Sequence, residues 1–213
     1  MSRMLLIIAL TLTTLFTALA GLLRAQPNND EALRALLLPE AGCAPPCFMG
    51  IRAGLTEGSV VRDLLSAHQW VERPPLSIRP INDANTQLFV WEWSGQQPNV
   101  VDTFWQGEVR VYKHIVRGVT VRTHIPFGAI WLALGATERG VAVFSLNRPD
   151  NRALTYIAVY ADSGLLVRFA VPQRATRAEF WNAPIEFESA NADALDYYGS
   201  YTLPQPCYWI CYR

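Results

Sequence analysis

The chain has 213 residues, of which 51% are hydrophobic, and its 18 basic and 18 acidic side chains give a formal net charge of zero. Nucleic-acid-binding proteins carry a surplus of Lys and Arg, so this charge balance argues against a nucleic-acid partner. The H-E-x-x-H, G-x-S-x-G, Walker and G-x-G-x-x-G motifs are also missing, and we expect no cofactor.

The first 25 residues have the features of an export segment. Arg3 supplies a positive charge, residues 4–23 are apolar apart from threonines and one glycine, and Ala-Leu-Ala at 18–20 is a small-x-small cleavage site. Twenty apolar residues are also enough to span a bilayer. We therefore expect residues 1–25 to be a signal peptide or an N-terminal membrane anchor, with the rest of the chain in an extracytoplasmic location.

Two helices are predicted in the part of the chain that follows. Residues 26–42 read as a linker and a short helix, Glu31–Leu38, which ends before a proline. A second helix is predicted over Glu57–Ala67, because its valines and leucines fall on one stripe. The hydrophobic period then changes to two, which is typical of strands. Strands are predicted near Leu76–Ile81, over Gln87–Trp93 and over Gly107–Val121, the last bent at Gly118.

The second half of the chain shows the same order of elements. A helix is predicted over Ile125–Gly135, with Pro126 in its first turn. Three strands follow, at Val141–Leu146, Leu154–Tyr160 and Leu165–Val171. Beyond Pro172 we predict a helical turn at Thr176–Trp181, a short strand at Ile185–Glu188 and a short helix at Ala190–Tyr198.

A helix followed by three strands therefore occurs twice. An offset of 70 residues aligns Gly58 with Gly128 and Leu64 with Leu134. We predict an α+β fold of tandem helix-then-antiparallel-strand repeats that form one sheet covered by helices on one face. The first repeat would be 43–121 and the second 122–172, followed by a C-terminal extension, 173–213. The alternative is a single α+β domain whose halves agree by chance.

Four cysteines form two pairs of identical spacing. Cys43 and Cys47 lie near the start of the exported part, and Cys207 and Cys211 lie near its end. Residues four apart in an extended segment are about 13 Å apart, and a disulfide tolerates at most about 7 Å between Cα atoms. We therefore expect bridges between the two pairs, with Cys43–Cys211 and Cys47–Cys207 preferred. Bridges within each pair, a four-cysteine zinc site and a redox-active dithiol are the alternatives.

Aromatic residues are the candidate contact surface. Alternate positions of a sheet with one covered face must face solvent, which favours aromatic residues on strands as contacts. A second aromatic cluster lies near the C-terminus. The candidate contact residues are Trp91, Trp93, Trp105, Tyr112, Tyr197, Tyr198 and Tyr201.

Acid–base pairs are the candidate catalytic groups. Glu186 with Glu188, or Asp193 with Asp196, would supply a general acid and a general base. His114 and His124 would be a further pair if the fold brought them together. Solvated strand and helix faces explain the same carboxylates without catalysis.

The segment 43–65 resembles two groups of exported bacterial proteins. Its run Cys43–Thr56 is similar to uncharacterised exported proteins that read C-x-x-P-C-[WF]-x-G-I-x-x-G-x-T. The stretch Gly50–Thr56, with the helix that follows it, resembles the BamE-like and β-lactamase-inhibitor-protein-like families. That resemblance implies helices followed by antiparallel strands, sometimes in tandem, and a habit of binding other molecules without catalysis.

These observations lead to one main expectation about function. We expect an exported, non-catalytic binding module of the bacterial cell envelope, whose partner is an unidentified protein or envelope component. Membrane attachment through residues 4–23 is compatible with this expectation. The alternative is an extracytoplasmic hydrolase with an unrecognised acid–base pair.

Overall fold

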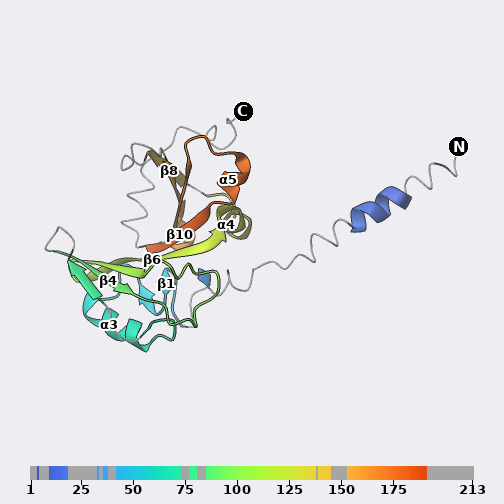
Figure 1. The fold of residues 1–213 in the computed structure, drawn as a ribbon. Helices are drawn as coiled ribbons and strands as arrows, with labels where there is room; N and C mark the ends of the chain where they lie inside the picture. Colours follow the sequence, from blue (N-terminus) through green and yellow to red (C-terminus); the bar gives the residue numbers. More distant parts are fainter. Residues whose placement is uncertain are drawn as a thin grey trace.

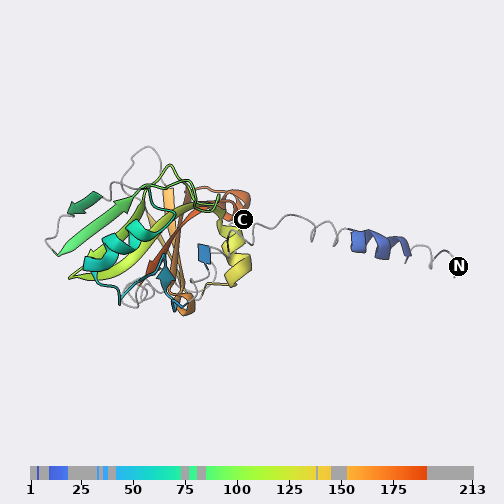
Figure 2. The same ribbon diagram turned by 90° about the horizontal axis from the view of Figure 1, so that it is seen from below.

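The fold is known from a computed structural model, and it is α+β. The described residues are Met4, 10–18, Leu33, Leu36, Leu37, 42–72, 77–80, 85–137, 139–144 and 153–190. Their main feature is an eight-stranded sheet in which every neighbouring pair is antiparallel (Figure 1). Figures 1 and 2 show that the strands change direction strongly between β4 and β8, as expected for a twisted sheet.

The first half of the sheet follows the chain order. A small hairpin, β1 (Cys47–Phe48) and β2 (Ile51–Arg52), precedes the helix α3 (Gly58–Ala67). The four strands that follow lie side by side in the order in which they occur. They are β3 (Ser77–Pro80), β4 (Thr86–Trp91), β5 (Gly107–Tyr112) and β6 (Ile115–Pro126).

The predicted long strand over Gly107–Val121 is wrong, because this segment is a hairpin. β5 and β6 are joined by Lys113 and His114, both of which have a positive φ (48° and 72°). Positive φ at both central residues is the geometry of the tightest hairpin turns, which Asn and Gly usually occupy. Lys and His give no such signal. The pairing of β5 with β6 is irregular between Arg110 and Val111, opposite Gly118 and Val116.

The second half repeats the helix and the four strands, with a 3₁₀ turn and a second, short helix added. The helix α4 (Phe127–Leu134) is followed by β7 (Arg139–Phe144), β8 (Ala153–Tyr160), a 3₁₀ turn η1 (Ala161–Ser163), β9 (Leu165–Pro172), the short helix α5 (Arg177–Trp181) and β10 (Pro184–Ala190). The sheet order is β3-β4-β5-β6-β10-β9-β8-β7. The C-terminal extension therefore supplies a central strand, and residues 121 and 122 both lie inside β6.

The main helices pack on the same side of the sheet. A Cβ on Gly58, the first residue of α3, would lie 2.7 Å from the side chain of Val111 on β5. Glycine there lets the helix approach the sheet closely, which explains a residue that is otherwise unfavourable in a helix. Phe127 of α4 stacks on Phe169 of β9 with 4.3 Å between ring centroids. The strand pairings from β5 to β9 place Val111 and Phe169 on one face, the helix side.

The core lies between this face and the helices. Phe187 on β10 is fully buried and packs edge-on against Phe48 of β1, at 5.2 Å. The largest fully buried side chains come from both halves of the chain, which therefore share one core. In this core they are Trp91, Phe127, Phe187, Ile51, Leu65, Ile130 and Ile185.

The preferred pairing of the cysteines is also wrong, because Cys43 is bonded to Cys47. The segment is not extended: the chain bends at Pro45 and Pro46, whose peptide bond is cis, and the two Cα atoms are 5.9 Å apart. A bridge within the pair is thus possible, and these two sulfurs are not available to a zinc ion or to a dithiol. Cys207 and Cys211 lie outside the described residues.

Other predictions also fall outside the described part of the chain. They include most of the helix Glu31–Leu38, the helix Ala190–Tyr198 beyond its first residue, and Tyr197, Tyr198 and Tyr201. Residues 10–18 are helical. Among the described helices, none has both the length and the apolar character required to cross a bilayer.

Replacing Phe187 with Ala should destabilise the fold strongly. Phe187 is 1% exposed and joins β10 to the core, and removing a buried phenyl ring costs about 3–5 kcal/mol. The matched control is Phe104→Ala, because Phe104 is 84% exposed and surface changes usually stay within about 0.5 kcal/mol. Urea denaturation followed by circular dichroism measures both. Equal losses would contradict the central position of β10.

Replacing Cys43 and Cys47 together with Ser should have a modest effect on stability. The two residues are four positions apart, and closing so short a loop is worth about 2 kcal/mol in the chain-entropy model. Peptide mapping without reduction should recover Cys43 joined to Cys47. Peptides that join either residue to Cys207 or Cys211 would contradict the bridge.

Candidate functional site: the polar face of the sheet

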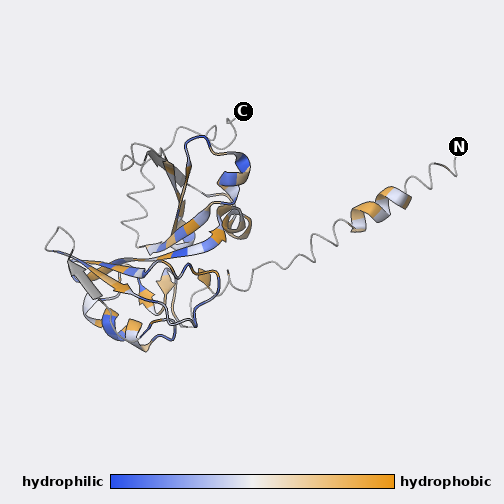
Figure 3. Cartoon of the chain, viewed as in Figure 1, coloured by the Kyte–Doolittle hydropathy of each residue, from blue (hydrophilic) through white to orange (hydrophobic). Residues whose placement is uncertain are grey.

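The side of the sheet opposite the helices carries a group of charged residues at its centre. The pairings of β5, β6, β10 and β9 put alternate residues of each strand on this side. The resulting change between polar and apolar segments is visible along β6 and β10 in Figure 3. We call this surface the polar face and define it by Glu108, Arg110, Thr120, Arg122, Arg168, Glu186 and Glu188.

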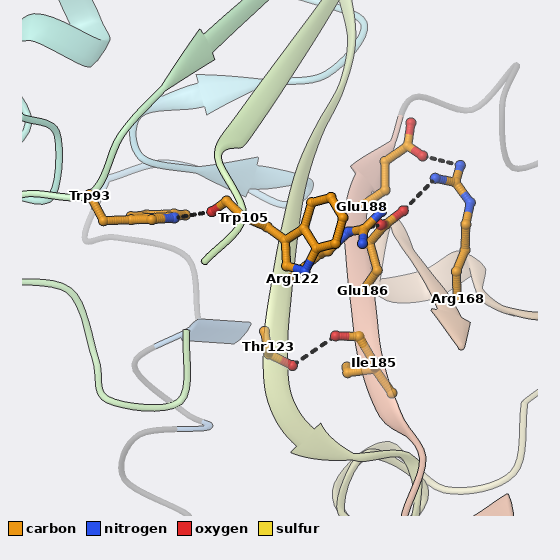
Figure 4. A network of polar contacts seen from close by, with 8 residues as sticks. All are labelled: Trp93, Trp105, Arg122, Thr123, Arg168, Ile185, Glu186 and Glu188. Carbon is orange, nitrogen blue, oxygen red and sulfur yellow. Dashed lines mark hydrogen bonds and ion pairs between the residues drawn. The ribbon is translucent and has the colours of Figure 1, made fainter. Parts of the chain in front are cut away.

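Two glutamates and three arginines of the polar face form one network across four strands. Figure 4 shows the two glutamates with Arg122 and Arg168. Arg168 on β9 contacts both Glu186, at 3.1 Å, and Glu188 on β10. Arg122 on β6 donates from Nε to Glu186 at 2.9 Å, and Arg110 on β5 lies 3.9 Å from Glu188. Each carboxylate is therefore shared by two arginines, which offsets the cost of holding Glu188 almost fully buried.

The position of Glu188 depends on a glycine of the neighbouring strand. A Cβ on Gly118 would overlap the carboxylate of Glu188. The missing side chain lets Glu188 lie across β6 toward Arg110. Gly118, which the sequence marks as the bend of a long strand, is thus the residue that admits the buried carboxylate.

An aromatic residue covers the exposed end of this network. The guanidinium of Arg122 lies 3.8 Å from the ring centroid of Trp105, a cation–π geometry. Both side chains are only half exposed, Trp105 at 45% and Arg122 at 44%. Phe104, edge-on to Trp105 at 5.5 Å, is the more exposed ring. An Arg–Trp stack with a second ring beside it is therefore open to solvent.

The loop that carries these rings, residues 92–106, is held against the sheet. The indole N–H of Trp93 donates to the backbone oxygen of Trp105 at 2.8 Å (Figure 4). The backbone N–H of Asp102 donates to the oxygen of Arg122 at 2.9 Å, and that of His124 donates to the oxygen of Val100 at 2.8 Å. These bonds fix the backbone of Trp105 beside β6.

A hollow of about 420 Å³ opens beside the Trp105–Arg122 stack. It runs from the loop across β6, β10 and β9 to Thr155 on β8. Its size falls in the range of ligand sites, about 300–1,000 Å³, but its lining is mixed and charged. The residues that line it are Asp102, Trp105, Arg122, Thr123, Thr155, Arg168, Phe169, Ala170, Pro184, Ile185 and Glu186.

The polar face is bordered by apolar residues on the same side of the sheet. Ile157 and Val159 of β8, Leu166 of β9 and Ala190 of β10 form a small cluster separate from the main core. The pairing of Ile157 with Arg168 places this cluster on the side of the network. The charged surface is therefore confined to the centre of the sheet.

Of the predicted contact residues on strands, two are wrong. Trp91 and Trp93 are buried on the helix side, edge-on to each other at 5.4 Å. The alternation was assigned to the wrong face, since Trp91 shares its face with Phe89, and Phe89 pairs with the core residue Val109. Trp105 is exposed in the loop, and Tyr112 lies on the other side of the sheet, 5.0 Å from the guanidinium of Arg117.

The candidate catalytic pairs do not form an acid–base site among the described residues. Glu186 and Glu188 are held by arginines. His114 and His124 lie at opposite ends of β6, about 30 Å apart at the usual rise of a strand. Asp193 and Asp196 lie outside the described part. No group of three His, Cys, Asp or Glu in that part has the geometry to hold a metal ion.

Two shifted pKa values lie elsewhere. Burial raises the pKa of Tyr160 to about 12, and within the described residues its hydroxyl has no hydrogen-bond partner. The backbone N–H of Thr176, followed by its hydroxyl, lowers the pKa of Glu179 at the start of α5. The first is a consequence of core packing and the second of helix capping.

Comparisons with protein-family models, curated proteins and solved structures find no match for this chain. The choice of the polar face as the candidate site rests on its geometry and chemistry.

Replacing Arg168 with Met should destabilise the protein more than the same change at Arg122. Arg168 is mostly buried and contacts both glutamates. Removing it leaves a buried carboxylate with only the distant Arg110, which we expect to cost about 3 kcal/mol. Arg122→Met is the matched control, because Arg122 is half exposed and such pairs contribute at most about 1 kcal/mol. Urea denaturation at pH 7 measures both, and equal losses would contradict the burial of the network.

Proposed function

We propose that the chain is an exported, non-catalytic module of the bacterial cell envelope that binds another protein. The contact surface is the polar face together with Phe104 and Trp105. The observation that carries the proposal is the half-exposed stack of Trp105 on Arg122, beside the more exposed ring of Phe104.

The composition of this surface favours a protein partner. Trp and Arg are the residues that most often dominate the binding energy of protein interfaces. The loop backbone at Trp105 is already held by the indole of Trp93. Binding therefore loses little conformational entropy from this loop. Arg110 and Arg122 keep half of their side-chain surface exposed while they hold the glutamates, and this leaves donors for carboxylates of a partner.

The charges of the polar face support a non-catalytic role. A general acid or base must present a carboxylate oxygen to a substrate, whereas neighbouring arginines occupy the oxygens of a carboxylate that they bind. Both Glu186 and Glu188 have such neighbours. Their contribution is therefore to hold the arginines in position.

The strand order supports the finer reading of the fold as two BamE-like or β-lactamase-inhibitor-protein-like repeats. One helix and a four-stranded meander, α3 with β3 to β6, is followed by a second, α4 with β7 to β10. The two meanders meet where β6 pairs with β10. Under this proposal the second repeat extends to Ala190.

The location in the envelope is supported by the N-terminal segment and by the disulfide. Residues 1–25 have the composition of a signal peptide or a membrane anchor. The Cys43–Cys47 bond is a bridge of the kind that persists in oxidising compartments. Both features are compatible with an extracytoplasmic module.

Photocrosslinking from chosen positions tests the contact surface. A photoreactive phenylalanine analogue at Phe104 should yield a discrete adduct in an envelope extract, since this side chain is the most exposed ring of the surface. The matched control places the same analogue at Val60, an exposed position on α3, on the opposite side of the sheet. Trp105→Ala in the Phe104 probe should reduce the adduct at least about tenfold, as expected for a hot spot worth about 2 kcal/mol.

Adducts of equal yield from Phe104 and Val60 would show that the polar face is not the contact surface. An unchanged adduct yield in Trp105→Ala would show that the Trp105–Arg122 stack is not part of the interface. Both results are read by gel shift and mass spectrometry of the same samples.

A further inference from the structure

α4 (Phe127–Leu134) is apolar on all sides, although only one stripe of it is buried. Phe127 and Ile130 face the core. Leu132 on the outer side is 86% exposed, and Ala133 next to it is exposed. A surface helix normally carries charged or polar residues on its outer side. An apolar outer side therefore indicates a partner for this helix.

The exposed side of α4 continues onto α5. The ring of Trp181 is stacked on Phe127 at 5.7 Å and lies edge-on to Trp131 at 5.5 Å. Trp181 is partly exposed, and Trp131 is half-buried. We call Trp131, Leu132, Ala133 and Trp181 the α4 patch.

Two basic residues lie on α5 and just before it. Arg177 is one helical turn before Trp181 on α5, and Arg174 precedes that helix; both are exposed. Tryptophan and arginine next to aliphatic residues are typical of surfaces that lie at the boundary between a bilayer and water. The single acidic residue of α5, Glu179, is held by the cap at Thr176.

The chain enters the domain next to α4. Leu36 and Leu37 line a small cavity of about 50 Å³ together with Leu134, the last residue of the helix. Residues 24–35 separate Leu36 from the apolar segment 4–23. Twelve residues span at most about 40 Å, so a bilayer that holds residues 4–23 lies within reach of α4.

We propose that the α4 patch rests on the outer surface of the lipid bilayer in which residues 4–23 are anchored. Leu132 and the two indoles enter the interface, and Arg177 and Arg174 meet anionic headgroups. This inference requires the uncleaved form of the N-terminal segment and goes beyond the proposed binding function. α4 and α5 then face the membrane, and the polar face points away from it.

The size of the patch favours a lipid surface over a second copy of the chain. An eight-residue helix is about 12 Å long, whereas a stable dimer buries roughly 800 Å² on each partner. A symmetric dimer through this patch would also bring the arginines of the two copies close together. Anionic lipid avoids that repulsion.

Quenching of tryptophan fluorescence by brominated lipid tests this proposal on the full chain in phosphatidylcholine–phosphatidylglycerol vesicles. Residues 1–25 contain no tryptophan, so the signal comes from the rest of the protein. Brominated acyl chains should quench the wild type, and Leu132→Glu should lower the quenched fraction by at least about half. The matched control is Leu55→Glu, since Leu55 is also exposed but lies before α3, and it should leave the quenching unchanged. Trp181→Phe should lower the quenching, and Trp105→Phe should not.

Absence of quenching in the wild type, or equal quenching in Leu132→Glu, would overturn the proposal. If Leu132→Glu instead converts a dimer to a monomer in detergent sedimentation, with quenching unchanged, the partner is a second copy and the proposal is also wrong. The Phe104 crosslink is also measured on Leu132→Glu, to distinguish membrane contact through the α4 patch from protein binding at the polar face. Loss of membrane contact should leave this crosslink unchanged.

Discussion

The antiparallel pairing of β6 with β10 is the constraint on which the rest of the structure depends. It joins the two halves of the sheet and places Glu186 directly beside Arg122. On the other side of the sheet, the same pairing sets Phe187 into the shared core. The register of β10 against β6 thus determines both the packing of Phe187 in the core and the charged network. A shift of this register by one residue would move the side chains of β10 to the opposite faces of the sheet.

The elements with a strong local signal were predictable from the sequence. α3 follows from its apolar stripe, α4 follows from the apolar run after Pro126, and β8 and β9 follow from alternation around the turn that ends at Gly164. The turn at Lys113 and His114 was not predictable, because neither residue favours the positive φ that it adopts. The bond between Cys43 and Cys47 is only an alternative at the level of the sequence, because the spacing argument assumes an extended segment and the chain bends at the prolines.

The site could be predicted only in part, because it is assembled by distant strands. Exposure of Trp105 was anticipated, but the burial of Trp91 was not, since alternation alone does not say which face is covered. Arg168 and Glu186 come from strands whose adjacency is a property of the sheet order. Pattern within a single segment carries no information on such pairs, and the network became visible only with the register.

The central place of β10 also affects how the polypeptide reaches its final form. Synthesis proceeds from the N-terminus, and β6 ends at Pro126 whereas β10 begins only at Pro184. Until that late strand is available, the backbone groups on one side of β6 have no partner within the sheet, and an unpaired edge invites association with other chains. The sheet is therefore complete only after β10 has been synthesised. A nascent chain that ends before Pro184 would keep the unpaired edge of β6 exposed, and this edge could pair with other chains.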